Sequence, residues 1–189
     1  VMSYVSYCTD NLKGKKLKPG RYTRDQCNHK LNASTSSGPP ANIRKSEMLD
    51  WNPGSQMYEM TDEMWEAAQE MIETWKQGKH SGGWYSSVQK EENRTVGKDP
   101  RVIYPDGVIR LIAKLILFGN YIEMVNENGA DMGLATGLDP QGAGAQVILD
   151  KISALGGYFK NRVIGTDFSG WDLSAPYEIK IAALNAIRS

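Results

Sequence analysis

The fold prediction starts from the sequence Thr166-Asp167-Phe168-Ser169-Gly170-Trp171-Asp172-Leu173-Ser174, which places two aspartates on either side of a glycine turn. The apolar pair before it begins a predicted strand that runs into Asp167. A carboxylate at a strand end is held at a sheet edge, where it suits a hard cation such as Mg²⁺. With eleven aspartates in the chain, a turn or capping role for Asp172 is the competing interpretation.

The second informative stretch is the charged run Lys90-Glu91-Glu92-Asn93-Arg94-Thr95-Val96-Gly97-Lys98-Asp99-Pro100-Arg101-Val102-Ile103. Its four cations are spread over twelve residues without helical or strand periodicity. Cations on a loop or ribbon can converge on a polyanion such as a triphosphate or an RNA backbone. The other interpretation is a solvated surface loop in which neighbouring acids are the partners. Those acids are Glu91, Glu92 and Asp99.

Apolar periodicity predicts the remaining elements. Residues 61–77 have the spacing of an amphipathic helix capped by Thr61 or Asp62, and residues 105–126 that of a long buried helix. A short strand is expected at 102–104, and further helices after Asp139-Pro140 and after Ser174. Residues 1–34 are expected to form loops and one short element, and residues 34–40 exclude regular structure, so a flexible linker is one interpretation of them. The pattern is typical of a mixed α/β or α+β protein.

Three of these segments, taken in order, resemble motifs G, F and A of the RNA-dependent RNA polymerases of positive-strand, picornavirus-like RNA viruses. They are residues 35–40, 90–103 and 167–172. The connecting sequence is similar too, with Phe118-Gly119-Asn120 ending a long helix and Gly137-Leu138-Asp139-Pro140 preceding motif A. The resemblance covers roughly residues 34–188. An ordered trio with matching connectors is more specific than any single motif.

The resemblance implies palm roles for three residues of motif A. Asp167 would bind the catalytic Mg²⁺ ions, or Mn²⁺ in their place, with the backbone carbonyl of Phe168 assisting. Asp172 would recognise the ribose 2′-hydroxyl of the incoming nucleotide. The Ser-Gly loop of motif B and the Gly-Asp-Asp of motif C do not occur in this sequence, so we expect the chain by itself to be inactive.

The resemblance also implies fingers roles for motifs F and G. Arg101 and Lys90 would contact the nucleotide triphosphate, and Lys98 and Arg94 are further candidates for that contact or for the template. The template strand would be steered into the site by residues 35–40. Their candidate contacts are Thr35, Ser36, Gly38 and Pro39.

The fold implied is an α+β right-hand polymerase, represented by part of the fingers and the first strand–helix unit of the palm. Fingers segments would occupy residues 1–160, and the palm would begin over residues 161–189. Because the chain opens on Val1 without a methionine and closes on Ser189 inside a predicted helix, we expect it to be cut from a longer polypeptide.

The implied function is template-directed RNA synthesis from NTPs by two-metal phosphoryl transfer. Template RNA, nascent RNA, NTPs and the rest of the polymerase chain would be the partners, in the host cytoplasm and at viral replication complexes there. A reverse transcriptase is one alternative, which Asp172 disfavours because those enzymes usually guard the ribose with a bulky residue at that place. A non-catalytic RNA-binding remnant of a viral polymerase is the other.

Composition excludes several other classes of protein. The net charge is zero, although residues 1–45 alone carry +7, so a small basic nucleic-acid-coating protein is disfavoured. Two cysteines, Cys8 and Cys27, exclude a disulfide scaffold, and with the two histidines they give only a weak zinc hypothesis. The sequence has no apolar stretch long enough to span a bilayer and no secretory signal at its start.

Overall fold

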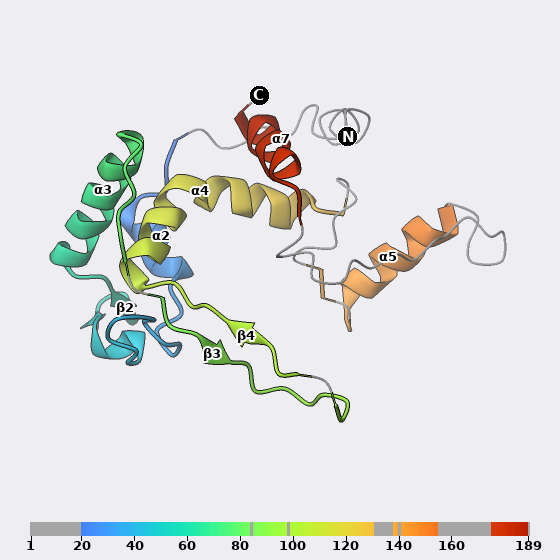
Figure 1. The fold of residues 1–189 in the computed structure, drawn as a ribbon, viewed down its shortest axis with the longest axis horizontal. Coiled ribbons are helices and arrows are strands. Elements are labelled where there is room, and N and C mark those ends of the chain that lie inside the picture. Colours follow the sequence, from blue (N-terminus) through green and yellow to red (C-terminus); the bar gives the residue numbers. More distant parts are fainter. Residues whose placement is uncertain are drawn as a thin grey trace. The chain divides into compact units, whose positions relative to one another are not determined.

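A computed structural model describes residues 20–83, 85–97, 99–130, 138–139, 141–154 and 175–188 of the chain. The chain divides into two compact units, one spanning Pro19–Asn120 and the other including Tyr121–Ser189. Figure 1 labels most of the helices and strands. In chain order they are α2 (Arg24–Lys30), η1 (Lys45–Glu47), β1 (Asp50–Asn52), β2 (Met57–Glu59), α3 (Asp62–Lys76), β3 (Val88–Gln89), β4 (Val102–Ile103), α4 (Val108–Asn128), α5 (Ala143–Ala154) and α7 (Tyr177–Arg188).

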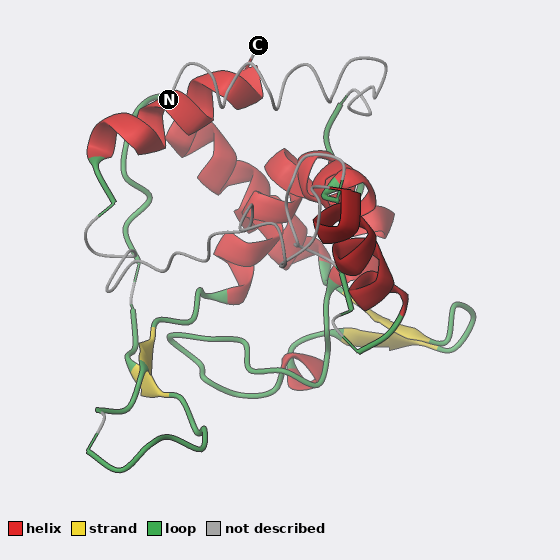
Figure 2. Cartoon of the chain, turned by 90° about the vertical axis from the view of Figure 1, so that its right-hand side faces the viewer, coloured by secondary structure: helices red, strands yellow, loops and turns green. Residues whose placement is uncertain are grey.

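The described residues form a mixed helix and sheet structure, as the sequence predicts. Its sheets are two antiparallel strand pairs, β1 with β2 and β3 with β4, which Figure 2 shows as short segments. The strand predicted to run into Asp167, and the palm sheet expected around it, lie outside the described residues. The assignment of fingers and palm therefore stays a prediction.

A threonine caps the first turn of both α2 and α3. The Thr23 hydroxyl oxygen accepts from the Gln26 amide at 3.3 Å, while the Gln26 side chain accepts from the Thr23 amide at 2.9 Å. Thr61 caps α3 by accepting from the Met64 amide at 3.3 Å. Each cap satisfies amides that the first turn leaves without a helical partner. The helix predicted over 61–77 is confirmed, and α2 is the short element expected in the N-terminal segment.

Helix α4 confirms the long helix predicted from apolar periodicity, with bounds two to three residues later than expected. Its buried face packs on the segment before α2, where the Tyr22 amide donates to the Ile116 carbonyl at 3.1 Å. Gly119 lies against the Tyr22 ring so closely that a Cβ at this position would overlap the ring. The glycine of Phe118-Gly119-Asn120 thus serves close packing.

The core of the unit spanning Pro19–Asn120 lies between α2, α3 and α4. Buried Asn28 links two of these helices, because its side-chain oxygen accepts from the Met60 amide at 3.0 Å just before α3. Burying such apolar surface supplies the main driving force for this packing. The buried apolar residues are Tyr22, Cys27, Leu49, Met60, Met64, Ala68, Ile72, Val108, Ile112, Ala113 and Ile116.

Helices α5 and α7 are the elements described after α4. The helix expected to open at Asp139-Pro140 begins at Ala143, because Asp139 forms a turn in which its carboxylate accepts from the Gln141 amide at 2.9 Å. The last predicted helix is confirmed as α7, while its proposed cap Ser174 lies outside the described residues. None of the described helices combines the length and the apolar character that crossing a bilayer requires.

Candidate functional site

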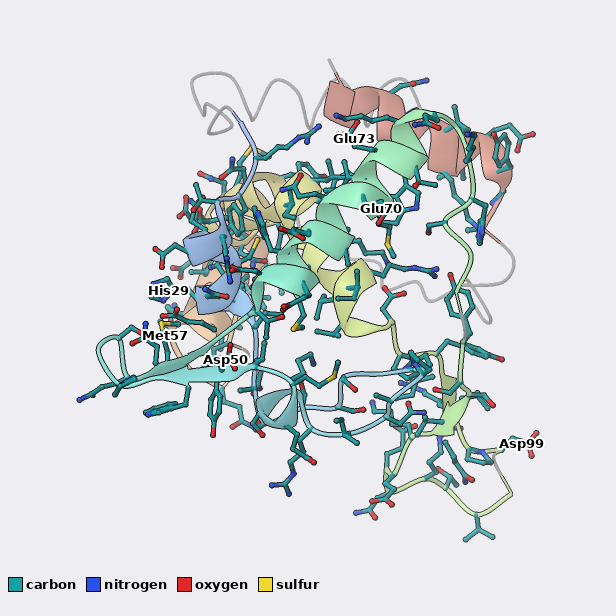
Figure 3. All side chains as sticks on the ribbon, turned by 90° about the vertical axis from the view of Figure 1, so that its left-hand side faces the viewer. His29, Asp50, Met57, Glu70, Glu73 and Asp99 are labelled. Carbon is teal, nitrogen blue, oxygen red and sulfur yellow. The ribbon has the colours of Figure 1, made fainter. Side chains whose placement is uncertain are left out.

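Residues 88–103, which contain the charged run, form an antiparallel hairpin that we call the cation hairpin. Val88 pairs with Ile103 and Gln89 with Val102. The ladder ends with the Lys90 amide donating to the Arg101 carbonyl at 2.8 Å. Figure 1 shows the hairpin as an extended ribbon, and Figure 3 shows Asp99 near its far end, away from the helices. The strand predicted at 102–104 is confirmed as β4.

Three of the four predicted cations meet at one carboxylate, that of Glu92. The ammonium of Lys90 lies 3.1 Å from Oε2 of Glu92. The Nε atoms of Arg94 and Arg101 lie 3.1 and 3.4 Å from its Oε1. The cations thus share the local acidic partner that the competing interpretation expected, and their convergence on a polyanion stays a prediction. The fourth predicted cation, Lys98, lies outside the described residues.

The charge balance of this cluster favours binding of an anion. A hydrogen bond from Lys90, together with the charges of Arg101, Lys90 and Arg94, lowers the pKa of Glu92 against a smaller opposing effect of desolvation. Glu92 is therefore ionised at neutral pH, and three positive charges around one negative charge leave the cluster at +2. The hollow along the hairpin, about 620 Å³, is in the size range of small-ligand sites, and its charged lining consists of Lys90 and Arg94 together with Glu91 and Glu92.

Residues 33–45, called here the template loop after the role predicted for residues 35–40, form no helix or strand before η1 begins at Lys45, but are firmly packed. Ser37 is only 1% exposed, and its amide donates to the Ile43 carbonyl at 2.7 Å. Its carbonyl accepts from the Val108 amide at 2.8 Å, which satisfies a free donor at the start of α4. Predicting irregular structure here was right, whereas the flexible-linker interpretation was wrong.

Lys45 closes the template loop from inside. Its backbone amide donates to the Thr35 carbonyl at 3.0 Å, and its ammonium donates to the Thr35 hydroxyl at 2.6 Å and the Ser36 carbonyl at 2.7 Å. Burial lowers the pKa of this lysine. Lys45 was not predicted as a site residue, since its sequence neighbourhood gives no sign that it is buried.

The template loop touches the segment that joins the cation hairpin to α4. A Cβ on Gly38, which has a φ of +68°, would lie 2.8 Å from the Asp106 carbonyl carbon and closer still to its oxygen. A Cβ on Gly107 would lie 2.7 Å from the Pro39 carbonyl oxygen. Only glycine permits such backbone approach, so the template loop meets the segment that leads from the cation hairpin into α4.

Arg110 ties the segment that precedes the cation hairpin to α4. Its guanidinium donates to the Gly82 carbonyl and the Tyr85 hydroxyl and lies over the Tyr85 ring, 4.8 Å from its centre. Sequence reasoning missed this residue. The available signal was an arginine in the first turn of a largely apolar helix, where the helix dipole disfavours a cation unless it has partners.

The four predicted template residues fall into two kinds. Thr35 and Ser36 are exposed, whereas Gly38 and Pro39 are buried against the segment before α4. A hollow of about 210 Å³, largely apolar, lies beside them and is bounded by the first turn of α4. The template loop thus exposes Thr35 and Ser36 to solvent, while Gly38 and Pro39 anchor it.

The motif A residues Asp167, Phe168 and Asp172 lie outside the described residues, so their predicted roles stay untested. Among the residues that the structure does describe, no three acidic, cysteine or histidine side chains gather to form a metal site. Cys27 lies in the core, and burial raises the pKa of its thiol to about 11, which disfavours the thiolate that zinc requires.

Of the comparisons with known proteins, the one with solved structures gives matches. No protein-family model matches the chain, and no curated protein does. Among solved structures, the Sicinivirus 3Dpol RNA dependent RNA polymerase is similar to this chain, with a TM-score of 0.59 and 18% sequence identity. The fold resembles part of a viral polymerase. The match covers 74% of this chain and 30% of that polymerase, and at this identity the likeness concerns the fold alone.

Proposed function

We propose that this chain is part of a viral RNA-dependent RNA polymerase, containing fingers segments and the first strand–helix unit of the palm. The reaction is attack of a 3′-hydroxyl on the α-phosphate of a template-paired NTP, with pyrophosphate leaving. The observation that carries the proposal is the gathering of Lys90, Arg94 and Arg101 on one hairpin, in a fold similar to part of such a polymerase. The chain spans less than a third of that polymerase, so the activity belongs to a longer protein.

In this proposal the cation hairpin binds the triphosphate of the incoming nucleotide. Phosphoryl transfer develops negative charge on phosphate oxygens, which fixed cations stabilise. Arg101 is the leading contact because its side chain is 63% exposed, against 26% for Arg94. Lys90, at 47%, is the second, and Lys98 is a further candidate on sequence grounds.

The template loop guides the template strand beside this hairpin. Thr35 and Ser36 are the exposed residues that meet the strand, while their hydroxyl oxygens also accept from the Lys45 ammonium and the Gly38 amide within the loop. Gly38 and Pro39 act through position, because their packing against the start of α4 fixes where the exposed pair lies. Template and nascent RNA are the macromolecular partners, in the host cytoplasm and its viral replication complexes.

The palm residues complete the site. Asp167 and the Phe168 carbonyl offer the oxygen ligands that Mg²⁺ prefers, and this donor chemistry fits the ion. When bound, Mg²⁺ or Mn²⁺ supplies the positive charge that stabilises the transferring phosphate. Asp172 accepts a hydrogen bond from the ribose 2′-hydroxyl, which distinguishes NTPs from dNTPs.

Parallel substitutions of the two aspartates in the complete polymerase test this assignment. Asp167→Asn removes the charge that holds the metal, so RNA synthesis should nearly vanish. Asp172→Asn keeps shape and some hydrogen bonding, so synthesis should drop but persist, while preference for NTP over dNTP falls by roughly five- to a hundredfold. Single-nucleotide incorporation of NTP and dNTP measures both effects. Unchanged sugar preference in Asp172→Asn would return that residue to a turn or capping role.

Two alternative functions are tested by two further observations, the sequence encoded after residue 189 and the use of dNTPs. A Ser-Gly loop and a Gly-Asp-Asp encoded after residue 189 would support the enzyme. An early stop would support the RNA-binding remnant. A reverse transcriptase would reveal itself by using dNTPs in the incorporation assay.

A further inference from the structure

We infer that Glu92 is a positioning residue, which holds Lys90, Arg94 and Arg101 together as one phosphate-binding cluster. The inference deepens the proposed function and rests on it, because it concerns the same triphosphate contact. It adds a role for an acidic residue inside an anion site. Like charges gathered at one point repel one another, and the negative charge of Glu92, which contacts all three, offsets that repulsion by attracting each of them.

The atoms through which the two arginines contact Glu92 support its role as a positioning residue. Both arginines approach Glu92 through Nε, which leaves the forked end of each guanidinium for other partners. Arg94 uses one terminal nitrogen on the Asp99 carbonyl across the hairpin turn. For Arg101, the described part of the chain provides no partner to the terminal nitrogens, and the side chain is largely exposed. A fork held by its Nε and open at its end suits bidentate capture of a phosphate.

The backbone supports the same interpretation. The Lys90 amide donates to the Arg101 carbonyl, so the first and last cations of the run flank one ladder bond. Arg94 lies beyond the ladder, and among the described residues Glu92 is what links its side chain to the other two cations, while its terminal nitrogen bonds the Asp99 carbonyl. Glu92 is itself only 22% exposed, so it occupies the inner side of the cluster while the more exposed cations, Lys90 and Arg101, face solvent.

Two accounts of Glu92 predict opposite signs. If Glu92 merely competes with an incoming anion, removing its charge should tighten anion binding. If it positions the cations, removing it should weaken binding even though the cluster gains a positive charge. Glu91 provides a matched control, because it is an exposed neighbour that pairs with none of these three cations among the described residues.

The experiment measures binding of inorganic tripolyphosphate to the full 189-residue chain by titration calorimetry. We expect Glu92→Gln to bind about fivefold more weakly than the parent chain, and Glu91→Gln to bind equally or more tightly. Glu92→Asp, which keeps the charge on a shorter arm, should recover part of the loss. The Nε–H signals of Arg94 and Arg101 in ¹H–¹⁵N spectra should move in Glu92→Gln and stay in place in Glu91→Gln, which also reports whether the variant is folded.

The Arg101→Ala variant separates failure of this inference from failure of the proposed function. Weaker binding by Arg101→Ala together with equal or tighter binding by Glu92→Gln would overturn the positioning role and leave the triphosphate contact standing. Tripolyphosphate binding that Arg101→Ala does not weaken, or no binding by the parent chain, would overturn the triphosphate contact and the positioning role with it.

Discussion

The template loop and the cation hairpin both reach the start of α4, and they are held there by different interactions. Backbone hydrogen bonds and close glycine contacts hold the template loop, with Ser37 almost completely buried. The hairpin has one short ladder with exposed strands, and its charged side chains are organised around Glu92. One segment is fixed by packing and the other by ion pairs.

The difference between packing and ion pairing indicates what each segment is suited to do. Ion pairs at a surface exchange partners readily and weaken with salt, so a hairpin held in this way can accept a new anion. A buried loop with satisfied backbone groups resists rearrangement, so it can set the path of a strand.

Replacing Gly38 by alanine should have the largest effect on stability. The new Cβ would overlap the Asp106 backbone, and the positive φ would add strain. We expect a loss of about 3 kcal/mol in the free energy of unfolding, measured by urea denaturation. Gly97→Ala in the hairpin is the matched control, since it has a φ of +90° and no described atom near its Cβ position. It should cost only about 1 kcal/mol. Equal losses would refute the contrast.

Replacing Lys45 by methionine should have the next largest effect. Methionine fills similar space but leaves the Thr35 hydroxyl and the Ser36 carbonyl without their shared donor. We expect a loss of about 2 kcal/mol in the free energy of unfolding. The exposed Lys79→Met serves as control and should change stability by less than about 0.5 kcal/mol. A loss in Lys45→Met no greater than in the control would mean that the ammonium does not hold the loop.

Lys45 also predicts a pH dependence of smaller size. Burial lowers the pKa of this lysine below its usual 10.5, so between the two pKa values the unfolded chain binds more protons than the folded chain. The stability of the parent chain relative to Lys45→Met should therefore increase as the pH rises toward 10.5. Urea denaturation of both chains at pH 8 and pH 10 measures how this stability difference changes. A difference that shrinks on raising the pH would contradict the sign.

The sequence predicts the regular elements of this unit well, because their signals are local. Apolar spacing and a capping threonine locate α3, and apolar spacing locates α4. The packing of the template loop could not be predicted in the same way. It depends on the hydrogen bond of Lys45 to Thr35, ten residues earlier, and on the contact of Gly38 with Asp106, which lies far along the chain.

The candidate site was predictable only in its composition. The run of cations and its acidic neighbours are visible in the sequence, but nothing in their order says that Glu92 rather than Glu91 or Asp99 joins the cations. That choice follows from the hairpin register, which is fixed by the pairing of β3 with β4. Arg110 illustrates the same limit, since its partners Gly82 and Tyr85 lie more than twenty residues away.

The smallest effect is expected for Arg101→Ala on stability, in contrast to its effect on anion binding. An exposed ion pair contributes little to folding, so the free energy of unfolding should stay within about 0.5 kcal/mol of the parent chain. Hydrogen exchange sharpens the test at two amides. The Lys90 amide donates to the backbone of Arg101, and that bond survives loss of the side chain, so its protection should not change. The Ser37 amide, bonded inside the template loop, should lose protection in Lys45→Met but not in Arg101→Ala. If Arg101→Ala exposes the Ser37 amide, the two segments depend on each other for folding, and the division between a packed loop and a charge-held hairpin is wrong.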